Sequence, residues 1–410
     1  MRDRKTIKFG YRGAAVLTAA AVAAATPMTA WATLASKPED NFAVPEPPAP
    51  DISKDLSPEF AYSEEKWAAL RDNVLEYGEI ADLVHEYNPT VRSNRSSYND
   101  QKNKDLTDIW QELMDDAMDL WDKADAEYSD DSMSRMSSAM TEYAGNNLAK
   151  MADNNYMDAD MYKISYDKTE ANLTYQAQQL MATYEVSAYS MGNLNANRAL
   201  AQANYEAAAA NQSVGNATQV DVLTAKKSVQ DIDVSILSAQ KSADNVHRNL
   251  CLMLGWAVDG QPEIRKVPEP DLNRIAAMNP EADREGAIAS NYDIRSNEIK
   301  LKNVSTNDLR AATQAEIDSG KDNVYSNLKS QYNAVLDARD ALEAANIKLQ
   351  LEAVNMNSAS AGAAVGNISN LALIQQQTAF TTAQNDVETA KLQLFLAMEQ
   401  YDWIKKGLTF

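Results

Sequence analysis

The chain has 410 residues, with 38 lysine and arginine residues against 59 aspartate and glutamate residues, and a formal net charge of −21. We do not expect so acidic a chain to bind nucleic acid, because phosphates need cationic partners. One cysteine and two histidines are too few for a disulfide framework or a Cys/His metal cluster, and nothing in the composition implies a cofactor.

The first 32 residues have the pattern of a secretory signal peptide. A basic start precedes an apolar run of small residues (14–25), and Ala30-Trp31-Ala32 supplies an A-x-A cleavage site. The run is short for a bilayer span, which needs roughly 20 apolar residues, so we expect cleavage and export. Cleavage removes five basic residues and one acidic residue, which gives a mature net charge of −21 − (5 − 1) = −25.

Proline divides the rest of the chain into blocks. Residues 33–60 are Pro-rich and predict an extended linker, and residues 259–282 (DGQPEIRKVPEPDLNRIAAMNPEA) predict a second linker. No proline lies between 90 and 261 or after 280, and glycine is scarce. Because proline stops helices, the two proline-free blocks are expected to form long helices.

A heptad pattern of apolar residues occurs once in each block, 151 residues apart. The first copy is Val222, Val229, Ile236, Ala243, Leu250 with Ala225, Ile232, Ala239, Val246, Met253. The second copy is Leu373, Phe380, Val387, Leu394, Tyr401 with Gln376, Ala383, Ala390, Ala397, Ile404. Preceding helices are indicated by Val335, Leu342, Leu349, Met356, Ala363 and, more weakly, by Tyr184, Met191, Arg198, Tyr205, Gln212. This spacing, kept over roughly four heptads, predicts coiled-coil helices.

Two short motifs predict the tips of helical hairpins. Val214-Gly215-Asn216 precedes Thr218, and Val365-Gly366-Asn367 precedes Ser369. Glycine suits the left-handed conformation at a helix end, whereas threonine and serine suit the N-cap of the next helix. Each block should therefore hold two antiparallel helices that reverse at this motif.

A second repeated motif marks the start of each half and reveals an insertion. NPTVRSN (88–94) resembles NYDIRSN (291–297) at an offset of 203, so the first half is longer by 203 − 151 = 52 residues. The extra residues lie within 99–170, a polar stretch with helical spacing of its apolar residues, which predicts one or two additional helices. In the second half, residues 302–330 predict a helix, a turn near Asp318-Ser319-Gly320 and another helix.

The duplicated tip motif, the opening YNPTV, the helix ending in LCLMLGW and the signal peptide resemble the TolC family of outer-membrane efflux proteins. The resemblance covers most of residues 75–258 and 283–403. It implies a protomer of long antiparallel coiled-coil hairpins in two structural repeats, for which the helical spacing of this sequence predicts an all-α fold class. The repeats are residues 61–258, with the polar helical insert near 99–170, and residues 283–410. It also implies a homotrimer in which twelve helical columns close into a hollow periplasmic α-barrel.

For function, the resemblance implies a passive conduit that exports small molecules or proteins with an inner-membrane pump and a periplasmic adaptor. Acidic residues narrow the entrance in this family; Asp221 is the candidate here, and its counterpart in the second copy is Ala372. Asparagine at 216 and 367 stands where the family often has leucine. The adaptor would dock on the tips, at Val214, Gly215, Asn216, Thr218, Val365, Gly366, Asn367 and Ser369.

The implied location is the cell envelope, in the outer membrane or periplasm, or at the cell surface of a cell without an outer membrane. Family members also insert a pair of strands into each half. The matching segments here, about 100–170 and 302–330, lack the period-two alternation of such strands, so we expect a nearly all-helical chain.

No enzyme motif is present, and the chain is not expected to be an enzyme or to bind a metal. His85 and His247 show no metal-ligand spacing and are expected to be surface or satisfied helix histidines. The alternative to a conduit is a non-conducting coiled-coil envelope protein, structural or adaptor in role, with the same helices and no open lumen. An elongated trimer in solution would favour the conduit, and a globular monomer would count against it.

Overall fold

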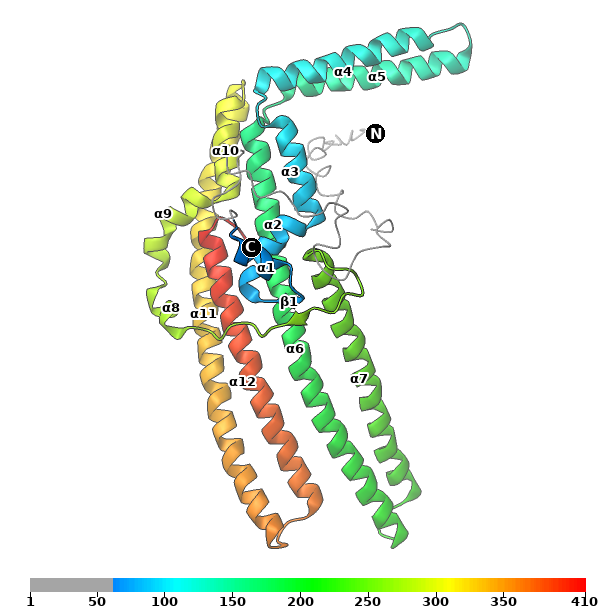
Figure 1. The fold of residues 1–410 in the computed structure, drawn as a ribbon, viewed down its shortest axis with the longest axis vertical. Coiled ribbons are helices and arrows are strands. Elements are labelled where there is room, and N and C mark those ends of the chain that lie inside the picture. Colours follow the sequence, from blue (N-terminus) through cyan, green and yellow to red (C-terminus); the bar gives the residue numbers. More distant parts are fainter. Residues whose placement is uncertain (1–61) are drawn as a thin grey trace, which may run out of the picture.

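The computed structural model describes residues 62–410; the predicted signal peptide (1–32) and Pro-rich linker (33–60) lie outside the described residues. The described chain is almost entirely helical, which confirms the predicted fold class (Figure 1). In chain order its elements are α1 (Glu64–Leu70), β1 (Val74–Leu75), the 3₁₀ turn η4 (Tyr77–Glu79), α2 (Ile80–Tyr87), α3 (Pro89–Gln101), α4 (Leu106–Glu127), α5 (Ser132–Asn154), α6 (Ala159–Ser213), α7 (Gln219–Met253), β2 (Glu263–Ile264), α8 (Leu272–Ala277), α9 (Pro280–Ser290), α10 (Tyr292–Asn303), α11 (Asn307–Ala364) and α12 (Asn370–Lys405).

The four longest helices form two antiparallel hairpins that lie side by side in one layer (Figure 1). α6 packs along α7, α11 packs along α12, and α6 packs along α12, so the order across the layer is α7–α6–α12–α11. With 55 and 58 residues, α6 and α11 are about 82 and 87 Å long at the usual rise of 1.5 Å per residue. The predicted long helical hairpins are confirmed, and α7 and α11 are the edge helices of the layer.

The predicted heptads form the seams between these helices. On α7, Val222, Val229 and Leu250 are buried, and the other seam positions are half-buried, whereas most residues between them are exposed. α12 lies between two neighbours and is buried on two sides. Its Leu394 belongs to the apolar cluster shared with α11, and its Phe395 belongs to a second cluster shared with α6.

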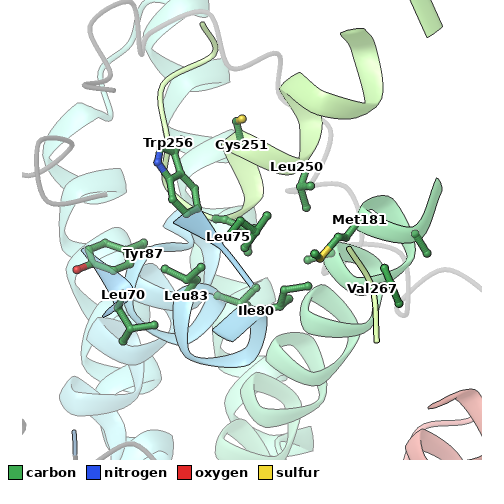
Figure 2. Close-up of a cluster of buried hydrophobic side chains, with 14 of the residues drawn as sticks. Leu70, Leu75, Ile80, Leu83, Tyr87, Met181, Leu250, Cys251, Trp256 and Val267 are labelled. Atoms are coloured by element: carbon green, nitrogen blue, oxygen red, sulfur yellow. The ribbon is translucent and has the colours of Figure 1, made fainter. Parts of the chain in front are cut away.

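That second cluster is the core at the upper end of the first hairpin. Figure 2 shows Ile80 and Leu83 of α2, Met181 of α6 and Leu250 of α7 converging there with Trp256, and all five are fully buried. Burial of this much apolar surface holds the N-terminal helices against the long hairpin.

Residues 259–282, predicted as a linker, contain β2, α8 and the first residues of α9. β2 pairs in parallel with β1, in the register Val74 to Glu263. The Val267 backbone N–H donates to the Glu185 carboxylate of α6 at 2.8 Å. This segment is therefore fixed to the body by backbone hydrogen bonds that a composition-based linker prediction does not foresee.

The repeated asparagine before α3 and α10 has the same structural role in each half. Asn88 caps α3 and donates to the Met253 carbonyl at the end of α7, at 2.9 Å. Asn291 caps α10 and donates to the Gly407 carbonyl just after α12, at 3.1 Å. Both side chains are buried. In each half, one asparagine thus joins the start of an upper helix to the end of the descending helix.

The turn predicted near Asp318-Ser319-Gly320 was wrong, because α11 runs unbroken through these residues. Gly320 instead provides room for a neighbour: a Cβ there would lie 3.2 Å from Ile294 Cγ1 of α10. The break falls earlier, between α10 and α11, where the Thr306 side chain caps α11 by accepting from the Leu309 N–H.

The stretch predicted as a polar insert contains α4 and α5, which form a hairpin that projects sideways from the upper end of the layer (Figure 1). Residues 302–330 are also helical, apart from the short break before α11. Within residues 62–410, no helix combines the length and the apolar composition needed to cross a membrane.

Candidate functional site

The two predicted tips lie at the same end of the layer (Figure 1). At the first tip, Gly215 has φ 82° and its N–H donates to the Gln212 carbonyl at 3.0 Å. The next N–H, of Asn216, donates to the Asn211 carbonyl at 2.8 Å. These two bonds form the Schellman arrangement, which satisfies the last carbonyls of α6 and requires the left-handed residue that glycine supplies.

The second tip repeats this arrangement bond for bond. Gly366 has φ 75° and donates to the Ala363 carbonyl at 3.0 Å, and Asn367 donates to the Gly362 carbonyl at 2.8 Å. Ile368 packs against Gly362, where a Cβ would lie 3.3 Å from Ile368 Cγ2. The duplicated motif therefore encodes two equivalent reversals of the chain.

The helix that leaves each tip is capped by the predicted hydroxyl residue, but the two caps differ. Thr218 and Asp221 form a reciprocal capping box, in which the Asp221 carboxylate accepts from the Thr218 N–H at 2.7 Å and from its hydroxyl at 2.8 Å. Ser369 caps α12 alone, by accepting from the Ala372 N–H at 3.1 Å. The hydrogen bonds from Thr218 lower the pKa of Asp221, so its carboxylate is ionised at neutral pH.

Each tip presents one exposed apolar side chain beside an exposed amide. Val214 and Val365 are 68% and 69% exposed, and Asn216 and Asn367 are exposed beside them. Such a surface can accept the apolar side of a partner and hydrogen-bond its polar groups. The structure places all the predicted tip residues together in two equivalent tips.

The sequence analysis missed a second apolar stripe on α7. Val220, Leu223, Val234 and Leu237 are between 53% and 69% exposed, and they lie on the side of α7 opposite its seam with α6. They recur at positions two residues before and one residue after the seam series that begins at Val222. The intervening heptad has Lys227 and Gln230 at these positions, so the stripe consists of two apolar pairs and gives no continuous heptad signal in the sequence.

A matching stripe lies on the other edge helix, α11. Ile347, Leu351 and Val354 are exposed on the side of α11 opposite its seam with α12. The upper part of the α7 stripe lies at a height above the tips comparable to that of the α11 stripe. Val234 is 234 − 219 = 15 residues from the start of α7, and Ile347 is 364 − 347 = 17 residues from the end of α11, or about 22 and 26 Å of helix. Val220 and Leu223 lie closer to the first tip.

A cleft of about 790 Å³ lies near the upper end of α6 and is lined by residues of α2, α3, α6 and α10. His85 at its wall is buried, and its Nδ1 lies 2.8 Å from a carboxylate oxygen of Glu170. The imidazole therefore belongs to a hydrogen-bonded packing contact between α2 and α6, as expected for a satisfied helix histidine.

The second histidine lies beside the one cysteine, one helical turn away on α7. Cys251 Sγ is 3.8 Å from His247 Nδ1. Burial raises the pKa of the Cys251 thiol to about 12 and lowers the pKa of His247. A thiol that stays protonated at neutral pH is a poor nucleophile, so this pair is explained by packing. In the part of the chain that the structure describes, no group of three or more His, Cys, Asp or Glu residues is arranged to hold a metal ion.

No family model and no curated protein sequence matches the chain. Among solved structures, the chain is similar to the CmeC outer membrane channel of Campylobacter jejuni, with 10% identity, TM-score 0.46, and coverage of 80% of this chain and 85% of that one. It is also similar to the outer membrane protein VceC of Vibrio cholerae, with 10% identity, TM-score 0.46, and coverage of 81% and 96%. The open state of the MtrE outer membrane channel of Neisseria gonorrhoeae gives 12% identity, TM-score 0.43, and coverage of 81% and 89%.

Proposed function

We propose that the chain is the protomer of a hollow helical ring that serves as a passive conduit in the cell envelope. The observation that carries the proposal is the pair of apolar stripes on α7 and α11, which overlap in height on the two open edges of the layer. Exposed apolar residues grouped in this way mark surfaces that are buried in an assembly.

The placement of the stripes favours a ring over a symmetric dimer. A two-fold contact would pair one stripe with the same stripe of the second copy, and it would leave the remaining stripe exposed on both copies. A head-to-tail contact pairs α7 of one copy with α11 of the next, buries both stripes, and closes into a ring when the rotation is right. α7 rises from a tip and α11 descends to one, so the new pair would be antiparallel, like every other pair in the layer. Three copies is the number that the resemblance implies.

We divide the chain into two repeats, residues 61–258 and 283–410, and each repeat contains one tip, between its two long helices. A ring of three copies would gather six tips at one end of the tube. The exposed Val214 and Val365 would then form an apolar docking circle for a periplasmic adaptor, which connects the tube to an inner-membrane pump. Three Asp221 carboxylates, ionised at neutral pH, would give this entrance a negative charge.

In this mechanism the chain carries no catalytic group, and the pump supplies the energy. Parting of the tip helices opens the entrance, and the signal peptide directs the chain to the envelope. Support for a water-filled interior comes from α12, a middle helix whose exposed residues include Gln375, Gln377 and Gln384.

The test is the mass and shape of the mature chain, residues 33–410, in solution. We expect an elongated particle of about three chain masses, with a central hole in end-on images. The double variant Val234→Glu/Leu237→Glu places two charges in the α7 stripe and should give monomers, because a buried unpaired carboxylate is strongly unfavourable. The matched control, Gln377→Glu/Gln384→Glu on the middle helix α12, adds the same charge outside the edges and should keep the trimer. A wild-type monomer, or a trimer that survives the α7 variant, would overturn the proposal.

A further inference from the structure

The α4–α5 hairpin stands apart from the rest of the described chain. α4 and α5 pack extensively on each other, and neither packs along any other described helix. Figure 1 shows the hairpin leaving the upper end of the layer at a steep angle, toward the side on which α7 lies. A hairpin of this kind is an arm whose outer surface is free to meet a partner.

The arm is held firmly at its root. Asn303 of the α10 end donates to the Tyr156 carbonyl at 2.9 Å and to the Asp158 carboxylate at 2.7 Å. Asp105 and Asp108 form a capping box that fixes the start of α4. The segment between α5 and α6 is therefore hydrogen-bonded to α10, and the other end of the arm begins at a capped helix start.

The seam between α4 and α5 is made mostly of small residues, and Ile109 of α4 is also buried. Ala117 and Ala124 of α4 face Ser138, Gly145 and Ala152 of α5, and all but Gly145 have side chains that are almost fully buried. A Cβ at Gly145 would lie 2.7 Å from the Trp121 ring and 3.1 Å from the Ala117 carbonyl oxygen. The two helices thus approach closely, and all the large apolar residues of α5 except the half-buried Leu148 are left outside the seam.

Those large residues form a stripe, which we call the methionine face, along the side of α5 opposite the seam. Its members are 60% to 76% exposed and comprise Met133, Met136, Met140, Tyr143 and Met151. From Met133 to Met151 the stripe covers 151 − 133 = 18 helical steps, or about 27 Å. Methionine is flexible and is common on surfaces that pack against a partner.

Charge separates the two outer sides of the arm. α5 carries two basic and two acidic residues, whereas α4 carries eight acidic residues and one lysine. The outer side of α4 is lined by Asp108, Glu112, Asp115, Asp119 and Asp122, all exposed. The methionine face is therefore nearly neutral, and the acidic side points away from it.

From this arrangement we infer that the arm clasps the next copy of the chain, with the methionine face buried between copies; the inference rests on the proposed ring. An anionic lipid surface would need a cationic excess around the apolar face, and α5 has none. A cationic helix would need acidic residues beside the methionines, and the acidic residues lie on the far side of α4. A second copy needs neither, and in the ring it stands beside the α7 edge, on the side toward which the arm points.

The experiment compares the full mature chain with three double variants of the arm. Met136→Ser/Met140→Ser should raise the concentration at which half the chains assemble by at least tenfold. Met136→Leu/Met140→Leu keeps the face apolar and should assemble like the wild type. Asp115→Asn/Asp119→Asn alters the opposite side and should also assemble like the wild type. Circular dichroism of each variant confirms that the helices are intact.

A second readout identifies what the methionine face touches. Met140→Cys is labelled with a maleimide benzophenone and photolysed; the buried, protonated Cys251 should not react. We expect a covalent dimer of the chain from position 140 and none from a labelled Asp119→Cys. Three results would overturn the inferred contact between the arm and the next copy while leaving the proposed ring intact. These are a wild-type trimer without the covalent dimer, an adduct only to lipid or to another protein, and an unchanged assembly midpoint in the serine variant. A wild-type monomer would overturn both.

Discussion

Replacing Gly366 by alanine should loosen the second hairpin tip without removing any contact. Gly366 has φ 75°, and no atom lies within 4 Å of the place where a Cβ would stand. The cost is therefore conformational, since a left-handed backbone costs a residue with a side chain roughly 1–2 kcal/mol. A cost of that size raises the open fraction of the tip about 5- to 30-fold.

Amide hydrogen exchange measures this opening directly, because exchange requires the tip hydrogen bonds to break. The Asn367 N–H, which donates to the Gly362 carbonyl, should exchange about 5- to 30-fold faster in the variant. Amides around the buried Val387, in the middle of α12, should be unchanged, because the effect is confined to the tip. Gly215→Ala should have the same effect at the first tip, since its φ is 82° and its surroundings are equally open.

Gly286 in α9 provides the matched control. It too has no atom within 4 Å of a Cβ position, but its backbone is helical, so alanine should gain about 1 kcal/mol of helix propensity and protect α9. Equal exchange at Asn367 in the wild type and in Gly366→Ala would refute the reasoning that backbone conformation selects glycine at the tips.

Two further predictions concern the second hairpin and the arm. Burial raises the pKa of Asp283, but hydrogen bonds from the Tyr401 hydroxyl (2.7 Å) and from Lys405 outweigh this and hold the pKa below its ordinary value. Because the pKa of Asp283 is lower in the folded state, its ionised carboxylate stabilises the fold at any pH above the unfolded pKa near 4. This stabilisation is lost as the pH falls through the folded pKa. Asp283→Asn should therefore lower thermal stability at pH 7, and the variant should lose less stability than the wild type on acidification to about pH 3. Gly145→Leu should speed exchange throughout α4 and α5 but not α6, because overpacking the seam against Trp121 costs about 1–3 kcal/mol or more; unchanged exchange in the arm would contradict the close approach of its helices.

The seams and the tips could be predicted from sequence because both depend on local information. A seven-residue apolar period predicts which side of a helix is buried, and Val222, Val229 and Leu250 are buried as predicted. A glycine followed three residues later by threonine or serine predicts where one helix ends and the next begins. Both tips have the bonds that this motif predicts, although the prediction that an adaptor docks there is still a proposal.

Features that depend on contacts distant in sequence were missed or misplaced. Gly320 suggested a turn, but it lies within an unbroken helix, where its missing side chain makes room for Ile294, 26 residues earlier. The pairing of Val74 with Glu263 joins segments 189 residues apart, and neither two-residue strand has a pattern of its own. Asp221 was predicted as an entrance residue because the resemblance places an acidic residue just past the tip, and the structure also gives it the local role of capping α7.

The distribution of exposed apolar residues separates a complete fold from a part of an assembly. Within residues 62–410, the middle helices α6 and α12 expose no large apolar side chain, although α6 alone has 55 residues. The edge helices α7 and α11 and the arm together expose most of those that exist. If exposed large apolar side chains were distributed at random over the surface, some would be expected on α6 and α12, which have neighbours on both sides. Each helix instead carries one apolar stripe for every neighbour it needs, and by that rule α7 and α11 each lack one neighbour, which another copy can supply.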